Sequence, residues 1–108
     1  GDVRNTFGIP SNKRKKIRPF NNNDYKNSLY LRFEVKDKPG VLSLITKRLA
    51  KFKISIKRII QTPDKKNNRA TIVIITHKTN ELNSRKCLEV FNRNKFIVRF
   101  PTLIRLYN

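Results

Sequence analysis

The residues best placed to do chemistry lie in a short loop, Asp37-Lys38-Pro39-Gly40, between an alternating strand pattern and a helical pattern. We expect Asp37 to cap the helix by accepting a backbone N–H near Gly40, and Pro39 suits the first helical turn because it has no N–H to leave unpaired. Gly40 removes a side chain where a ligand would approach the free amides, and helix N-termini favour anions such as an amino-acid carboxylate. The loop therefore predicts a small-ligand site, although a tight turn that binds nothing explains these residues equally well.

Residues for catalysis or metal binding are not grouped in this sequence. It has no Gly-x-Gly-x-x-Gly, no phosphate loop and no paired cysteines. The single histidine, His77, ends an apolar run with no nucleophile or carboxylate pair placed beside it, and Cys87 falls in a helical pattern where a small buried hydrophobe is expected. We expect no catalytic residue, no metal and no cofactor in this chain.

The sequence predicts a cytoplasmic location. It has no run of 18 apolar residues and no apolar signal-peptide core at its N-terminus, and a lone cysteine fits a reducing compartment. The chain contains no methionine, so we expect it to be a piece of a longer protein.

The charge raises nucleic acid as a partner, because 26 Lys and Arg against 7 Asp and Glu give a net charge of +19. The basic residues are spread along the chain, however, and the densest run, residues 13–18, is typical of a solvated linker. RNA-recognition motifs stack bases on aromatic side chains of their central strands. The expected third strand, residues 69–76, has no aromatic residue. We expect nonspecific attraction to phosphates at most, and no membrane partner.

Hydrophobic periodicity divides the chain into a linker or tail over residues 1–27 and one domain over residues 28–108. The first half of the domain predicts a strand with a buried face, a helix over 41–52, and a second strand over 54–61. The buried face of the first strand consists of Leu29, Leu31, Phe33 and Val35. In the second strand, alternation places Ile54, Ile56 and Ile60 on one face, and Ser55, Lys57, Ile59 and Gln61 on the other.

The second half predicts a turn around Pro63 to Asn68, and then a strand over 70–76 that is apolar on both faces and therefore central. Thr79 or Asn80 would cap a second helix, and a final strand over 96–106 is interrupted at Pro101.

This order of elements predicts an α+β, ferredoxin-like βαββαβ fold with two helices on one face of a four-stranded antiparallel sheet. The other face would carry Val73, Ile75 and Ile59. An apolar face of this kind needs a cover, so we expect a homodimer formed through the sheet.

Five segments carry a resemblance to a known family. They are Tyr30-Leu31-Arg32-Phe33, Asp37-Lys38-Pro39-Gly40-Val41-Leu42, Ile54-Ser55-Ile56 followed by Ile60-Gln61, Ala70 to His77, and Ile104-Arg105. Together they resemble the ACT domain, an amino-acid-binding regulatory module, and in detail the one at the C-terminus of bacterial homoserine dehydrogenases. Phe7-Gly8-Ile9-Pro10 is similar to the segment that joins that module to the catalytic part.

The resemblance implies an effector site and a parent enzyme. Its ligand-binding residues would be Asp37, Lys38, Pro39, Gly40, Val41, Leu42, Ser55, Ile56 and Gln61, the last three lying near the interface with a neighbouring module. Threonine is the implied effector, acting by feedback. The parent would be an NAD(P)-dependent oxidoreductase that interconverts aspartate semialdehyde and homoserine in threonine, methionine and isoleucine biosynthesis, with its catalytic and cofactor residues outside this chain.

One position departs from the family pattern. Family members usually have Gly before the Ile-Ser-Ile segment, where this chain has Lys53, which is unfavourable if the helix must end in a left-handed conformation. A pairing module that has lost its ligand, and a basic RNA-binding domain of the same topology, are the alternatives.

Overall fold

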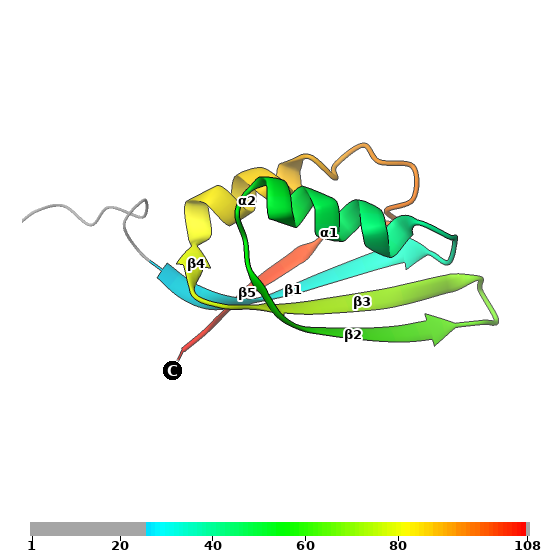
Figure 1. Ribbon diagram of the computed structural model, residues 1–108. Helices are drawn as coiled ribbons and strands as arrows, with labels where there is room; N and C mark the ends of the chain where they lie inside the picture. The colour runs from blue at the N-terminus through cyan, green and yellow to red at the C-terminus, as the bar shows by residue number, and fades with distance from the viewer. Residues whose placement is uncertain (1–25, 108) are drawn as a thin grey trace, which may run out of the picture.

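The computed structural model describes residues 26–107 (Figure 1). Its elements are β1 (Lys26–Lys36), α1 (Val41–Lys51), β2 (Ile56–Asp64), β3 (Arg69–Thr76), β4 (Thr79–Asn80), α2 (Glu81–Glu89) and β5 (Thr102–Leu106). The predicted tail over residues 1–27 lies outside this part of the chain, except that Lys26 and Asn27 already belong to β1.

The strands form one antiparallel sheet in the order β2-β3-β1-β4, with β5 also paired to β1. β1 is central because it pairs with β3 through Phe33 and Ile72 and with β5 through Leu31 and Leu103. Both helices lie on one side of the sheet (Figure 1). The predicted ferredoxin-like architecture is therefore confirmed, with the two-residue β4 as an unpredicted fifth strand.

The core fills the space between the helices and the sheet. The alternating positions of β1 from Leu29 to Val35 are buried as predicted, and α1 buries Val41, Ile45 and Leu49 against them. The rings of Phe33 and Phe91 meet edge to face, with their centroids 5.3 Å apart. These apolar contacts fix α1 and α2 on β1 and β3.

A β-bulge near the start of β2 changes which of its residues face the helices. Ile56 pairs with Thr76 but Arg58 pairs with Ile75, so one extra residue is inserted between them. Cross-strand partners share a face of the sheet. Ile59 therefore lies on the helix side opposite Ile74, and Ile60 lies on the open face opposite Val73. Simple alternation predicted the reverse for Ile59 and Ile60 and was wrong because it did not include the bulge.

Helix α1 ends in a left-handed residue, and that residue is Lys53, with φ of 60°. The amide of Lys53 donates to Ala50 O at 2.9 Å and the amide of Ile54 donates to Leu49 O at 3.0 Å. These two bonds define a Schellman motif, in which glycine is the usual left-handed residue. Lys53 thus adopts the left-handed conformation that is unfavourable for lysine, at the position where family members usually have glycine.

The C-terminal third contains less strand than predicted. Asn80 caps α2, as one of the two predicted candidates, by accepting the amide of Asn83 at 2.8 Å. Residues 96–101 form no continuous strand; a single bridge joins Ile97 to Val35, and β5 begins only after Pro101. Proline lacks the N–H that a strand ladder uses, so pairing starts after it.

Candidate functional site

A cavity of about 360 Å³ opens where β1 passes into α1. Its walls come from the loop that joins these elements, the first turn of α1, and the neighbouring ends of β2 and β3. The lining residues are Val35, Lys36, Asp37, Lys38, Pro39, Gly40, Val41, Leu42, Gln61, Ala70 and Ile72. The β1–α1 loop and the β2–β3 turn lie at the same end of the molecule (Figure 1). We refer to this cavity as the β1–α1 corner.

Helix α1 begins at this corner with its amides uncapped by any side chain. Gly40 is the N-cap residue, with φ of 87°, and its carbonyl accepts the amide of Leu44 at 2.9 Å. The amides of Leu42 and Ser43 have no intrahelical acceptor, as in the first turn of any helix. Nothing lies within 4 Å of the place where a Cβ on Gly40 would be, so the left-handed backbone is what requires glycine here.

Two details of the predicted helix start were wrong. Asp37 does not cap α1, because Gly40 takes the N-cap position and no side chain hydrogen-bonds there. Pro39 precedes the N-cap, so it lies outside the first helical turn. The reason is that residues 38–41 form their own turn, closed by the amide of Val41 donating to Lys38 O at 3.3 Å. Asp37 is exposed and is one of the residues that line the cavity.

The loop itself is held in place by backbone hydrogen bonds. The amide of Asp37 donates to Asn68 O in the β2–β3 turn at 3.0 Å, and the amide of Lys38 donates to Lys36 O at 3.0 Å. Asn68 adopts a left-handed conformation with φ of 56°, which asparagine tolerates better than most residues. The corner thus presents amide donors and one carboxylate on a fixed backbone.

Gln61 joins this corner because of the bulge in β2. It pairs with the buried Ile72, so its side chain is on the helix side of the sheet, beside the loop. Ser55 and Ile56 are at the other end of β2: Ile56 pairs with Thr76, and the Ser55 carbonyl accepts the amide of His77 at 3.0 Å. Gln61 is five residues further along β2 than Ile56, which is roughly 16 Å at about 3.3 Å per residue. One chain therefore does not bring Ser55 and Ile56 to the corner.

The isolated reactive side chains are placed away from the cavity. Cys87 is fully buried, its thiol donates to Arg48 O at 3.7 Å, and burial raises its pKa to about 11. His77 is an exposed residue just after β3. Residues 26–107 contain no cluster of three or more His, Cys, Asp or Glu suited to a metal ion. No helix in that range has the length and apolarity needed to cross a bilayer.

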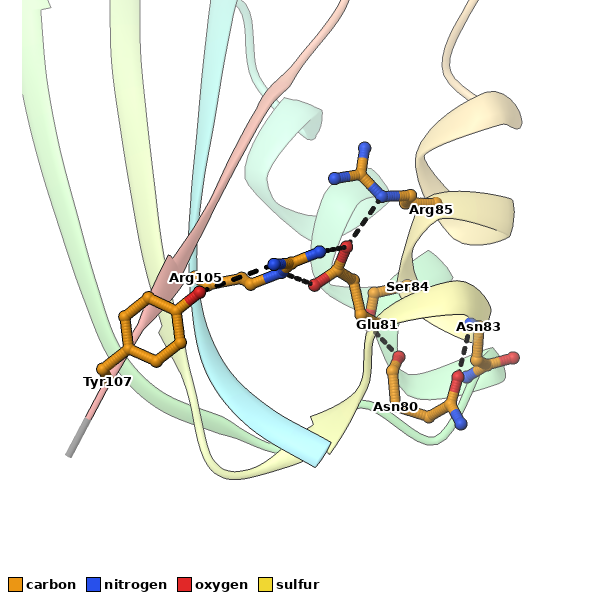
Figure 2. A network of polar contacts seen from close by, with 7 residues as sticks. All are labelled: Asn80, Glu81, Asn83, Ser84, Arg85, Arg105 and Tyr107. Carbon is orange, nitrogen blue, oxygen red and sulfur yellow. Dashed lines mark hydrogen bonds and ion pairs between the residues drawn. The ribbon is translucent and has the colours of Figure 1, made fainter. Parts of the chain in front are cut away.

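A polar network that the sequence analysis missed joins α2 to β5 (Figure 2). The side chain of Glu81, only 9% exposed, accepts hydrogen bonds from Arg105 Nε and Nη2 and from Arg85 Nε, the last two at 3.1 Å. The hydrogen bonds from Arg105 lower the pKa of Glu81, and burial opposes this shift. The hydrogen bond from Arg85 lowers the pKa further. An acidic residue in the first helical turn, four residues before an arginine, is the sequence signal that was available. The network is structural: it fastens β5 to the start of α2.

The chain matches the family model of the ACT domain over residues 29–95. Among curated proteins it is similar to homoserine dehydrogenases from Helicobacter pylori, with 34% identity over 79 residues, and from Neisseria gonorrhoeae, with 34% identity over 80 residues. These alignments cover 73% and 74% of this chain but only 19% and 18% of the relatives. The chain spans about a fifth of the length of the homoserine dehydrogenases that it matches.

Solved structures give the same result. A homoserine dehydrogenase from Thiobacillus denitrificans superposes with a TM-score of 0.75 and 26% identity, over 87% of this chain and 20% of that one. The ACT domain of a GTP pyrophosphokinase from Chlorobium tepidum superposes with a TM-score of 0.57 and 18% identity, over 75% of this chain and 99% of that one, and shows the fold alone. Residues 29–95, which match the ACT family model, contain the β1–α1 corner and every element except β5 and the first three residues of β1. This chain belongs to the ACT domain family and is related to the region of homoserine dehydrogenases that carries such a domain.

Proposed function

We propose that this chain is the amino-acid-sensing regulatory module of a homoserine dehydrogenase, that threonine is its effector, and that two copies complete the binding site. The observation that carries this proposal is the cavity at the β1–α1 corner, which combines uncapped helix amides with a carboxylate and an amide side chain.

The corner offers a complementary partner for each group of a free amino acid. The α-carboxylate would accept hydrogen bonds from the backbone amides of Leu42 and Ser43, where the positive end of the α1 dipole favours an anion. The α-ammonium would pair with Asp37, and Gln61 would hydrogen-bond a polar side chain such as the hydroxyl of threonine. The small apolar wall of Val41 and Leu42 suits a short side chain.

Pairing of two copies through the outer edge of β2 supports the rest of the site. β2 is an edge strand whose residues are all at least partly exposed, with Ile59 39% and Ile60 46% exposed. An antiparallel pair of β2 strands with its two-fold axis at Ile59 would place the bulge of the second copy, between Ile56 and Arg58, opposite Gln61. That arrangement supplies the Ser55 and Ile56 groups that one chain holds too far away.

The parent enzyme, in this proposal, interconverts aspartate semialdehyde and homoserine with NAD(P), through residues outside this chain. Effector binding would alter the catalytic part by favouring one arrangement of the paired modules over another. The relatives named homoserine dehydrogenase are about four times as long as this chain, which leaves room for such a catalytic part.

Isothermal titration calorimetry with threonine, isoleucine, methionine and lysine tests the sensing function. We expect heat with threonine in preference to the other three, and its loss in Asp37→Asn, because the ammonium loses its counter-charge. Glu89→Gln is the matched control: it removes one exposed carboxylate at the end of α2, away from the corner, and should bind as the unchanged chain does. Heat with none of the four amino acids would contradict the proposal.

Light scattering with a β2 variant tests the pairing separately. The chain should be dimeric at micromolar concentration, and Ile59→Pro should dissociate it, because proline removes a backbone donor from this strand. The same measurement on Thr102→Pro, at the start of the opposite edge strand, should leave the dimer intact. A dimer without threonine binding would reduce the module to a pairing device, and a monomer that binds threonine would overturn the two-copy site.

A further inference from the structure

The open face of the sheet, opposite the two helices, carries a track of aromatic, aliphatic and arginine side chains. β3 contributes Val73 and Ile75 to it, and no aromatic residue, as predicted. β1 contributes Tyr30 and Arg32, which pair with Ile75 and Val73. The aromatic side chains that β3 lacks are thus present on β1, as Tyr30, and on the segment before β5, as Phe100.

A groove of about 320 Å³ forms one half of this track. It is lined by Tyr30, Arg32, Glu34, Arg99, Phe100, Thr102 and Ile104. Phe100 is 47% exposed and Ile104 is 50% exposed, so both present a large apolar surface to solvent. A second hollow, lined by Lys57, Arg58 and Ile75, adjoins the groove because Ile75 is the cross-strand partner of Tyr30. Together they cross four of the five strands, β5, β1, β3 and β2.

The one acidic residue of the groove, Glu34, is already engaged. Its carboxylate accepts hydrogen bonds from Arg32 Nε at 2.7 Å and from Thr71 Oγ1 at 2.8 Å. Burial opposes the charged form of Glu34, but these hydrogen bonds and the nearby charges of Arg32 and Arg99 lower its pKa overall. Glu34 therefore stays ionised and holds Arg32 in place beside Tyr30, while the guanidinium groups of Arg32 and Arg99 are still exposed to a further anion.

We infer that this open-face track binds single-stranded nucleic acid, with bases on Tyr30 and Phe100 and phosphates on Arg32, Arg99 and Arg58. Exposed aromatic rings alternating with arginines are the elements by which proteins bind single strands without reading sequence. Charge complementarity selects this occupant, because a chain of net charge +19 attracts a polyanion. A second copy stacked face to face would instead bring these arginines near arginines. The inference is independent of the proposed amino-acid site, which lies on the helix side of the sheet.

Fluorescence anisotropy with a 12-nucleotide fluorescein-labelled oligo(U), titrated over a series of KCl concentrations, tests the inference. Phe100→Ala should weaken binding by about fivefold or more, since a stacked base is lost. Arg99→Gln should reduce the slope of log affinity against log salt by about 0.7, the value for one phosphate contact on a single strand. Arg99 is exposed, so this second variant reports on the groove even if Phe100→Ala lowers stability.

Two matched variants separate the groove from diffuse charge attraction. Tyr107→Ala removes a more exposed aromatic ring from the strand end outside the groove, and Lys47→Gln removes one exposed charge from α1 on the other layer. Both should leave affinity within twofold and the salt slope unchanged. The inference is overturned if these controls weaken binding as much as the groove variants do. It is also overturned if a 12-base-pair duplex binds as tightly as oligo(U), or if free UMP competes as well per nucleotide as the oligomer.

Discussion

Replacing Lys53 by glycine should stabilise this domain, because Lys53 holds the left-handed position that ends α1. A residue with a Cβ pays about 1–2 kcal/mol in that conformation, whereas glycine adopts it without steric cost. Glycine also loses more chain entropy on folding, by roughly 0.5–1 kcal/mol. The difference leaves a gain of about 0.5–1 kcal/mol in the free energy of unfolding, or about 2–8 °C in Tm for a domain of this size.

Urea unfolding followed by circular dichroism measures this gain in Lys53→Gly, provided that the transition is two-state. Lys51→Gly is the matched control, because Lys51 is an exposed lysine two residues earlier with a helical backbone. That change should destabilise the domain by about 1 kcal/mol. Equal destabilisation by both substitutions would refute the assignment of a left-handed backbone at Lys53 and, with it, the Schellman end of α1.

Three further predictions concern the core and the buried polar groups. Phe91→Ala should cost about 3–5 kcal/mol of unfolding free energy, because it empties the fully buried contact with Phe33, and a loss under 1 kcal/mol in urea unfolding would contradict that packing. Glu81→Gln should lower the urea midpoint at pH 7. The folded pKa of Glu81 lies below its unfolded value, so its stabilising effect is present above about pH 4.3 and is lost as the pH falls through the folded pKa. The difference in urea midpoint between the unchanged protein and Glu81→Gln should therefore disappear in acid. A difference that is constant with pH would contradict the ion pairs. Cys87 should react with Ellman's reagent at pH 7.5 only as the chain unfolds, since its pKa is about 11 and it is buried, and rapid labelling of the folded protein would contradict this burial.

Periodicity in the sequence was sufficient for most of the fold. Burial determines which positions are apolar, and the sequence shows those positions directly. This holds for the alternation from Leu29 to Val35, for the helical spacing from Val41 to Leu49, and for β3, which is apolar on both faces. The bulge in β2 was not predictable in this way, because one inserted residue leaves composition unchanged but reverses which side Ile59 and Ile60 face.

The candidate site was predictable where it is local in the chain. The loop from Asp37 to Leu42 lines the cavity because a strand followed by a glycine-started helix places those residues together by covalent continuity alone. The cap at Asp37 was mispredicted because the turn over residues 38–41 depends on the left-handed Gly40, which sequence spacing does not reveal. The Glu81–Arg105 contact joins residues 24 apart, so it required the fold to be known.

Two-dimensional 1H–15N NMR of the uniformly labelled chain, titrated with L-threonine, tests the central claim most directly. Binding at the β1–α1 corner should shift the amide resonances of Gly40, Leu42 and Ser43, while the exposed amides of α2 near Glu89 stay in place. A saturating excess of threonine that leaves the amides of residues 37–43 unmoved would contradict the account.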